Sequence, residues 1–372
     1  MPWLWRPCRA SRGGAVPGHG SRPRQVGHYD GCSCARGGGE PSCGGPALLE
    51  QPPLARVERG DGDSMRLVYE RLLASGQCDA LLQHGGGLFV GPPSGPHSSG
   101  FREWAVRCMA DDEDRDGAVK AMLAVAFNAF SSTPHGRFQM VYRTLAKANH
   151  SCIGNACVQA PEHGPGRLIC IRAVAPNEEV TVSYLCDEEL ARPSAFRNRQ
   201  LLERWEFECA CQRCSGPVDD VRVFSCPRSD SCSGRCHALH AQASGALTTT
   251  ACNSCGQEPC SSLLARWQER EREVESFMDG LPSTLYSAWA LSEEFSTAHP
   301  DHWLTARWKR YIAAVTEADA ERAETASEAE ELRFEAAAHA AVEKRCLQAL
   351  LKLPPPKESS PQPSPLTGQS SW

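Results

Sequence analysis

The sequence contains no apolar run long enough to span a bilayer, which takes about 20 residues. It also has no excess of basic charge, since 39 Lys and Arg residues stand against 45 Asp and Glu residues and the net charge is -6. Non-specific binding to nucleic acid depends on a basic surface, so direct nucleic-acid binding is not expected. We therefore expect a soluble protein with no membrane partner.

The first residues, MPWLWRPCRASRGG, lack the apolar core of a secretion signal, although the chain holds 20 cysteines. Disulfide scaffolds are normally short and secreted, and the most closely spaced cysteines here follow metal-site spacings. We therefore expect reduced, zinc-binding thiolates in an intracellular protein of the nucleus, the cytoplasm or both. Five arginines and no acid in residues 1–29 are also typical of a mitochondrial transit peptide, but the weak amphipathic pattern favours a solvated tail.

Composition divides the chain into segments. Residues 1–62 are rich in Gly, Pro, Arg and Ser, and we expect them to be disordered, like the Pro- and Ser-rich tail 354–372. Residues 63–186 begin with helical patterns, of which the apolar stretch from Ala118 to Phe130 predicts a buried helix. They continue with short segments rich in Val, Ile and aromatic residues, which predict strands. A cysteine-dense region follows within 187–260, and residues 261–353 have helical patterns. The predicted fold class is α+β.

The strongest chemical signal is a group of three cysteines, Cys209, Cys211 and Cys214, within six residues. Three thiolates this close together suit one tetrahedral zinc ion but leave it one ligand short. The fourth ligand must therefore come from elsewhere in the chain.

Three motifs in order resemble the carboxy-terminal half of a SET domain with its post-SET zinc motif. They are Asn149-His150-Ser151-Cys152-Ile153-Gly154-Asn155, the segment Glu179-Val-Thr-Val-Ser-Tyr184, and Phe207-x-Cys-x-Cys-x2-Cys. The helical tail, and Asn128-Ala-Phe130 upstream, are most similar to the SET-and-MYND (SMYD) branch of that family. The resemblance covers residues 120–214 well and the remainder loosely.

The resemblance implies a β-rich domain with a knotted cofactor site, S-adenosylmethionine as methyl donor, and a protein lysine as acceptor. Asn149 and His150 match the pair that contacts the cofactor, and Asn128 matches an asparagine that also lies there. Phe207 matches an aromatic residue that covers the adenine or the channel, and Tyr184 matches the tyrosine of the methyl-transfer channel. Cys152 matches the cysteine that completes the zinc site.

The residues also permit a purely structural interpretation. Tyr184 alone suits an ordinary strand tyrosine, His150 a structural histidine and Phe207 a core residue.

Methyl transfer from a sulfonium to an amine is an in-line displacement, so catalysis is mostly alignment. The lysine must lose its proton, and a neutral tyrosine hydroxyl suits the task of orienting the amine.

A second metal site is indicated by Cys252-x2-Cys255-Gly256, the spacing of a zinc knuckle. Two more ligands are needed from Cys226, Cys232 and Cys236, with His237 or His240 as competitors. We expect the ligands of this second zinc ion to be Cys226, Cys232, Cys252 and Cys255. Such a site would be structural, because four protein ligands leave no open position for chemistry. The alternative is a group of free structural thiols.

The sequence departs from the family at three places. The Gly-x-Gly strand that holds the cofactor is represented only by Gly85-Gly86-Gly87-Leu88-Phe89, which its Pro- and Gly-rich surroundings favour as a connecting loop. Cys32, Cys34 and Cys43 are too few for the two zinc sites of a MYND finger. Gly154 occupies the usual position of a proline, where glycine can also form a tight turn.

The sequence is therefore compatible with two functions of different kinds. The first is an active protein-lysine methyltransferase that acts on histone or non-histone proteins. The second is a catalytically inactive interaction module with the same fold and zinc sites but no cofactor binding. A nucleic-acid-binding zinc protein is disfavoured, because the basic residues around the clustered cysteines are few.

Overall fold

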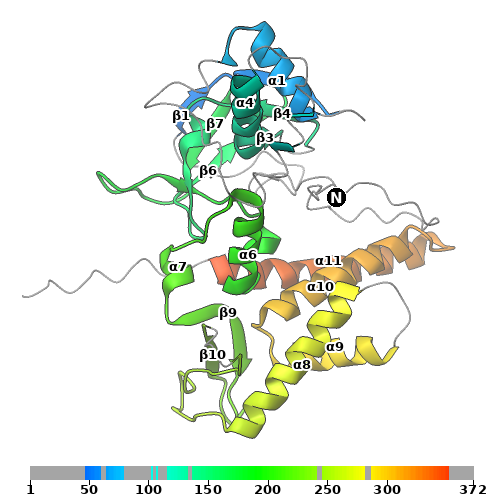
Figure 1. Cartoon of the computed structure of the whole chain (residues 1–372). Coiled ribbons are helices and arrows are strands. Elements are labelled where there is room, and N and C mark those ends of the chain that lie inside the picture. Colours follow the sequence, from blue (N-terminus) through cyan, green and yellow to red (C-terminus); the bar gives the residue numbers. More distant parts are fainter. Residues whose placement is uncertain are drawn as a thin grey trace, which may run out of the picture.

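A computed structural model describes residues 47–59, 64–78, 102–103, 106–107, 115–132, 136–240, 245–280 and 286–351. The chain is an α+β protein of helices and short strands, as expected. A strand-rich part lies above, and the long helices from α8 (Ser261–Gly280) to α11 (Ala326–Leu351) lie below it (Figure 1). Helices α6 (Ser194–Trp205) and α7 (Gln212–Ser215) lie at about the height of α11. In the described part, no helix combines the length and apolar character that crossing a membrane requires.

The strand-rich part contains two three-stranded antiparallel sheets and one short parallel pair. The first sheet has the order β1 (Ala47–Gln51), β7 (Gly166–Cys170) and β6 (Ala156–Gln159). The second has the order β2 (Ala55–Glu58), β4 (Phe138–Val141) and β3 (Ala129–Ser131). The parallel pair joins β5 (Asn149–His150) to β8 (Thr181–Val182).

The expectation that residues 1–62 are disordered is wrong for Ala47–Glu58, which forms β1 and β2. These strands gain their stability from distant partners, since Leu49 pairs with Leu168 and Val57 pairs with Gln139. A short strand in a Gly- and Pro-rich stretch is hard to recognise from sequence when the strand that pairs with it lies far along the chain. The strand-rich part therefore begins before residue 63. Residues 1–46, the candidate segment Gly85–Phe89 and the tail 354–372 lie outside the described residues.

Two helices pack against this part, α1 (Ser64–Ala74) and α4 (Arg115–Asn128). The α4 sequence is apolar on nearly every side, and most of its residues from Val119 to Phe127 are buried, as the pattern predicts. The expected helix continues to Phe130, but α4 ends at Asn128 and Phe130 lies in β3. There its ring packs edge-on against that of Tyr142, just after the paired strand β4, with the ring centroids 5.7 Å apart; helical periodicity cannot show such a contact.

The chain then passes through a 3-10 turn and several short elements that lead downwards. These are η2 (Leu145–Lys147), α5 (Asp187–Leu190), α6 (Ser194–Trp205) and α7 (Gln212–Ser215). The cysteine-dense region contains an antiparallel hairpin, β9 (Val218–Ser225) and β10 (Arg235–Leu239), which the cysteine pattern did not predict.

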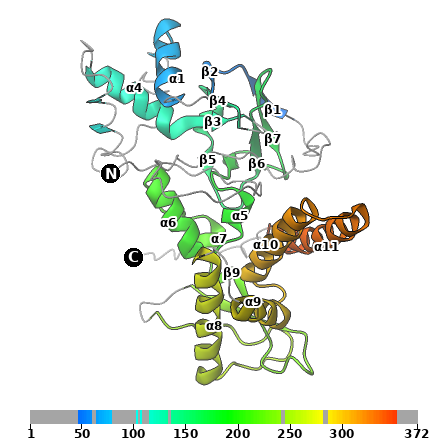
Figure 2. The ribbon, with the colours of Figure 1, turned by 90° about the vertical axis from the view of Figure 1, so that its right-hand side faces the viewer.

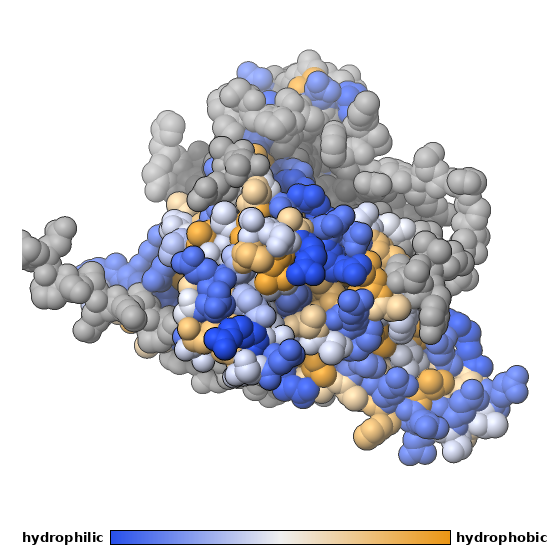
Figure 3. All heavy atoms as spheres, turned by 90° about the horizontal axis from the view of Figure 1, so that it is seen from below, coloured by the Kyte–Doolittle hydropathy of each residue, from blue (hydrophilic) through white to orange (hydrophobic). Residues whose placement is uncertain are grey.

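Four helices complete the lower part, within the segment expected to be helical (Figure 2). They are α8 (Ser261–Gly280), α9 (Tyr286–Ala298), α10 (Trp303–Ala320) and α11 (Ala326–Leu351). Their shared core includes Phe224 stacked on Trp267, with ring centroids 4.9 Å apart. Seen from below, hydrophilic and hydrophobic residues are interleaved over the coloured part of this surface, as on an ordinary solvated face (Figure 3).

A buried ion pair joins β9 to α8. Both carboxylate oxygens of Glu271 accept hydrogen bonds from Arg222, at 2.8 and 2.6 Å, and His302 Nε2 lies 3.2 Å from the same carboxylate. Burial alone would raise the pKa of Glu271, but His302 and Arg222 hold it well below its usual range. A bidentate geometry of this kind is what makes a buried charge tolerable.

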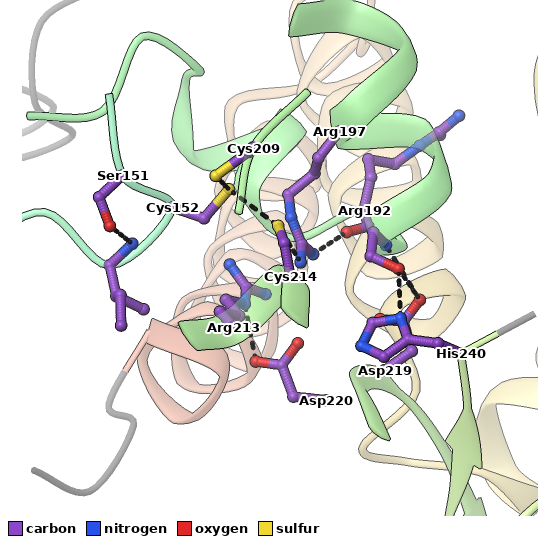
Figure 4. A network of polar contacts seen from close by, with 12 residues as sticks. Ser151, Cys152, Arg192, Arg197, Cys209, Arg213, Cys214, Asp219, Asp220 and His240 are labelled. Carbon is purple, nitrogen blue, oxygen red and sulfur yellow. Dashed lines mark hydrogen bonds and ion pairs between the residues drawn. The ribbon is translucent and has the colours of Figure 1, made fainter. Parts of the chain in front are cut away.

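The amino-terminus of α6 is held by β9. Asp219 Oδ2 accepts from the Ser194 backbone N–H at 2.9 Å and from its hydroxyl at 3.1 Å, and His240 Nδ1 lies 2.8 Å from the same hydroxyl (Figure 4). These are the three residue types of a hydrolytic triad, in which the histidine lies between the serine and the aspartate. Here the Ser194 hydroxyl lies between Asp219 and His240 instead. The arrangement caps a helix and does not activate a nucleophile.

Candidate functional site

The four cysteines of the proximal cluster, Cys152, Cys209, Cys211 and Cys214, converge on one point. Their sulfur atoms all lie within 4.8 Å of one another, and the Cys152 sulfur is 3.9 Å from that of Cys209 and 3.5 Å from that of Cys214. A disulfide would bring two sulfurs to about 2.05 Å. A tetrahedral zinc ion with Zn–S bonds of about 2.3 Å separates its sulfurs by about 3.8 Å. The spacing is therefore that of a metal site.

Local structure places each of these ligands. Cys152 lies just after β5, while Cys209 follows α6 and its backbone N–H donates to Asn198 of that helix at 3.0 Å. Cys211 is the residue before α7, and its N–H points at the Cys209 sulfur, 3.5 Å away. Arg213, in α7, forms an ion pair of 2.7 Å with Asp220 of β9. The cluster thus links the β5 turn to the lower part of the chain.

Electrostatics favours thiolates in this cluster. Arg197 is fully buried, and its guanidinium donates to the Cys214 sulfur at 3.5 Å and to the Arg192 carbonyl at 2.6 Å (Figure 4). Burial would lower the pKa of Arg197, but the charges of Cys152 and Cys214 raise it above its usual value. Four thiolates around Zn²⁺ carry a net charge of about -2, which this arginine partly offsets.

The protons of the proximal cluster are shared unequally. Hydrogen bonds from Cys152 lower the pKa of Cys211 to about 5 and hold that of Cys209 below its usual range, while contacts with those two sulfurs raise the pKa values of Cys152 and Cys214. A bound metal ion would replace these shared protons, so metal binding here releases protons and strengthens as pH rises.

Four aromatic rings gather beside this cluster. The ring of Tyr184 lies 5.3 Å from His150, 5.3 Å from Trp205 and 6.2 Å from Phe207, measured between centroids. His150 and Phe207 are also neighbours at 5.9 Å. The structure therefore brings together His150, Tyr184 and Phe207, which belong to three separate sequence motifs. Trp205 is an addition, buried at the end of α6, that sequence analysis did not single out.

The hydroxyl of Tyr184 has a defined environment. It donates to the Ala148 carbonyl at 2.9 Å, and burial, with a smaller contribution from Glu179, raises the pKa of Tyr184 to about 12. The hydroxyl therefore stays neutral throughout the physiological range. Because its proton is donated to Ala148, it can orient an amine by accepting a hydrogen bond from it.

The two asparagines have partners of their own. The Asn149 side chain is exposed, and its nitrogen donates to Glu179 at 2.6 Å. The Asn128 side chain is buried, and its nitrogen donates to the Ala124 carbonyl one turn earlier in α4, at 2.7 Å. That Asn128 and Asn149 share a pocket with His150 and Phe207 stays a prediction.

Asn155 is the last residue of the first sequence motif, and its side chain holds the turn after β5, residues 151–155, in place. It is 1% exposed. Its side-chain oxygen accepts from Thr181 N–H at 2.8 Å, and its nitrogen donates to the Glu179 carbonyl at 2.8 Å and to the Glu178 carboxylate at 3.0 Å. Gly154 beside it has no room for a side chain, since an added Cβ would lie 2.9 Å from the Thr181 carbonyl. Glycine is thus needed there for close approach, not only for a turn.

A second set of four cysteines, the distal cluster, lies in the lower part. The sulfurs of Cys226, Cys232, Cys252 and Cys255 all lie within 4.8 Å of one another; the Cys226–Cys255 and Cys232–Cys252 distances are 3.5 and 3.8 Å. Three of these sulfurs receive a backbone N–H from the residue two positions later, at 3.3 Å for Cys226, 3.4 Å for Cys232 and 3.5 Å for Cys252. Such N–H groups stabilise thiolate charge.

The structure selects among the ligands that the sequence left open. Cys236 is fully buried in the apolar core of the lower part and is not a member of the distal cluster. Burial raises its pKa to about 11, as expected for an inert structural thiol. The competing His240 contacts Ser194 instead. A side chain at Gly234 would lie 2.3 Å from the Cys252 sulfur, so the distal cluster also depends on a glycine.

Comparison with known proteins gives partial sequence matches to a group of enzymes. No family model matches the chain. It is 36% identical over 80 residues to the protein-lysine N-trimethyltransferase SMYD5 of Mus musculus, which covers 21% of this chain and 19% of that protein. The same enzyme of Danio rerio is 35% identical over 83 residues, or 22% and 20% of the two chains. The histone-lysine N-methyltransferase ATXR2 of Arabidopsis thaliana is 41% identical over 70 residues, or 18% and 14%.

These matches confirm the resemblance to lysine methyltransferases of the SET and SMYD type over part of the chain. The matched stretch spans about a fifth or less of the length of these relatives.

Proposed function

We propose that the chain is an S-adenosylmethionine-dependent protein-lysine N-methyltransferase. The observation that carries this proposal is the position of Tyr184, whose ring contacts those of both His150 and Phe207. The same His150 contacts the proximal cluster through Cys152. The names of the relatives agree with this chemistry. In this proposal, the SET domain extends to residue 186, residues 187–260 form the zinc-binding post-SET region, and a knotted crossing near β5 and β8 forms the cofactor site.

When bound, S-adenosylmethionine would supply the methyl group. The contribution of the protein is alignment of the acceptor amine, because an in-line displacement needs little else. The Tyr184 oxygen would accept an N–H of the neutral amine, which leaves the amine lone pair directed at the methyl carbon. Asn128, Asn149, His150 and Phe207 are the proposed cofactor-binding residues. An apolar, partly buried surround favours the neutral amine over the ammonium.

Both cysteine clusters would hold Zn²⁺ in a structural role. Four thiolate ligands leave no open coordination position, so the ions would stabilise the fold and not take part in methyl transfer. The proximal ion would fix the segment that carries Phe207 against the turn after β5. The distal ion would join the β9–β10 hairpin to the loop before α8.

The proposed substrate is a lysine on a histone or another intracellular protein, in the nucleus or the cytoplasm. The test is isothermal titration calorimetry with S-adenosylmethionine on zinc-loaded protein, followed by labelling of mixed histones and cell lysate with radioactive cofactor. Cofactor binding together with labelled acceptors would support the proposal.

The alternative is a zinc-dependent interaction module without cofactor binding. It is favoured by one observation, that the amides of both Asn128 and Asn149 already have partners within the protein. Zinc-loaded, folded protein that gives no heat with the cofactor would establish this alternative and overturn the methyltransferase proposal.

A further inference from the structure

The imidazole of His150 contacts two groups at once. Its Nε2 atom lies 3.3 Å from the Cys152 sulfur, a member of the proximal cluster. Its Nδ1 atom accepts the backbone N–H of Tyr184 at 2.9 Å. One side chain therefore bridges a metal ligand and the backbone of the residue proposed to orient the substrate.

These contacts assign the tautomer of the ring. An Nδ1 atom that accepts the Tyr184 N–H cannot itself carry a proton, so in the neutral ring the proton is on Nε2. The Nε2–H group then points at the Cys152 sulfur and donates to it. A metal-bound thiolate is a good acceptor for such a bond, because it is charged and held in place.

The bond to Tyr184 extends the pairing of β5 with β8. His150 pairs with Val182, and Ser151 N–H donates to the Val182 carbonyl at 2.9 Å. Strand β8 ends at Val182, and two residues later the Tyr184 N–H donates to the His150 ring nitrogen. The position of the Tyr184 backbone thus depends on a side chain that is itself oriented by a sulfur.

We propose that His150 is a positioning residue that transmits the metal occupancy of the proximal cluster to the backbone of Tyr184. This inference rests on the proposed zinc occupancy of that cluster. With the ion bound, the Cys152 thiolate holds the ring so that Nδ1 faces the Tyr184 N–H. Without the ion, the Cys152 side chain is free to turn, the ring loses its anchor, and the Tyr184 N–H loses its acceptor.

The two arms of the bridge can be separated by substitution. In His150→Asn, the amide oxygen stands near the place of Nδ1 and can accept from Tyr184, but the side chain does not reach the sulfur. In His150→Gln, the amide nitrogen stands near the place of Nε2 and can donate to the sulfur, but it offers no acceptor to Tyr184. The pair therefore tests each hydrogen bond without removing polarity from the site.

The experiment measures hydrogen exchange of single backbone amides in the full chain, before and after zinc removal by a chelator. In the wild type, zinc removal is expected to speed exchange of the Tyr184 amide by about tenfold or more, as for a lost local hydrogen bond. The Ser151 amide reports on opening of the β5–β8 pair, and the amides of β6 and β7 report on the fold.

His150→Asn is expected to keep the Tyr184 amide protected with or without zinc, while releasing zinc to the chelator faster than the wild type. His150→Gln is expected to release zinc at the wild-type rate but to leave the Tyr184 amide unprotected even when zinc is bound. If Tyr184 and Ser151 lose protection together, the strand pair opens as a unit and the proposed bridge is overturned.

Two further outcomes separate this inference from the proposed metal site. Wild-type protein that binds zinc but shows the same Tyr184 exchange after its removal would overturn the bridge and leave the zinc site intact. Wild-type protein that binds no zinc at the proximal cluster would overturn both. Neither outcome depends on methyl-transfer activity, so the methyltransferase proposal is tested independently.

Discussion

The guanidinium of Arg197 lies 3.5 Å from the Cys214 sulfur, and Arg197 is fully buried. A buried cation needs negative charge close by, and here the sulfurs contribute it together with the Asp219 carboxylate. The contact is therefore independent support for thiolates at the proximal cluster, beyond the convergence of the sulfurs themselves.

We expect Arg197→Met to weaken zinc retention and to lower the free energy of unfolding by about 3 kcal/mol or more, because it leaves the buried cluster without its counter-charge. Zinc release to a coloured chelator and urea unfolding would measure the two effects. Arg199→Met is the matched control, since Arg199 lies in the same helix and is exposed. Equal zinc release from wild type and Arg197→Met would contradict the proposed charge balance.

Metal analysis of the purified chain should give two equivalents of zinc, one for each cluster. Cys209→Ser should remove the proximal equivalent and Cys252→Ser the distal one, because zinc prefers thiolate over hydroxyl ligands. Cys260→Ser, at an exposed cysteine outside both clusters, should retain both equivalents. A single equivalent in the wild type, unaffected by Cys252→Ser, would show that the distal cysteines are free thiols.

Tyr184→Phe should lower the rate of methyl transfer by roughly 10²-fold while cofactor binding stays nearly unchanged, because the hydroxyl is needed to orient the amine. The measurement is single-turnover labelling at saturating cofactor, with calorimetry for the binding step. Tyr142→Phe is the control, since Tyr142 is another buried tyrosine whose pKa burial raises to about 12, but it lies in the core between the sheets. Equal rates of methyl transfer for Tyr184→Phe and the wild type would show that this hydroxyl does not orient the acceptor amine.

The lower part of the chain should lose stability in acid through His299. Burial, together with the neighbouring His302, lowers the pKa of His299 to about 3, whereas an unperturbed histidine titrates near 6.5. Between these values the unfolded chain binds the proton and the folded chain does not. The stabilisation is therefore fully present above about pH 6.5 and is lost as the pH falls towards 3, by up to about 1.4 kcal/mol per pH unit.

The test compares urea unfolding of the wild type with that of His299→Asn between pH 7 and pH 4.5. The asparagine oxygen can accept the Ser225 N–H that His299 Nδ1 now accepts at 3.1 Å, but it cannot be protonated. The stability of the variant should decline less steeply with acid, and comparison of the two proteins cancels the pH dependence of zinc binding. Parallel pH profiles would show that folding leaves the pKa of His299 unchanged and would contradict this prediction.

The parts of this structure that depend on local spacing are the parts that sequence predicts well. Cys209, Cys211 and Cys214 are close in sequence and cluster in space, and the spacing of Cys252 and Cys255 likewise placed both in one cluster. The apolar pattern of α4 correctly indicated a buried helix. In each case the interaction partners lie within a few residues, so periodicity or spacing contains the information.

Several features that the sequence does not reveal join distant segments. Arg197 looks like any other arginine of a polar helix until the fold places Cys214 against it. Strands β1 and β2 lie in a stretch of low-complexity composition and exist because β7 and β4 offer them partners. Cys152 was assigned to the proximal cluster only through family resemblance, because no spacing rule connects it to Cys209, and the structure places its sulfur there.

The pairing of β1 with β7 also sets an order of events during synthesis. Leu49 leaves the ribosome about 120 residues before its partner Leu168. At a translation rate of roughly 5 to 20 residues per second, β1 therefore waits about 6 to 24 s without its neighbour. Throughout that interval an edge with unsatisfied backbone groups is available to other nascent chains and to chaperones. The first sheet can close only after β7 emerges, so premature termination upstream of residue 166 would yield a fragment prone to aggregation rather than a smaller folded protein.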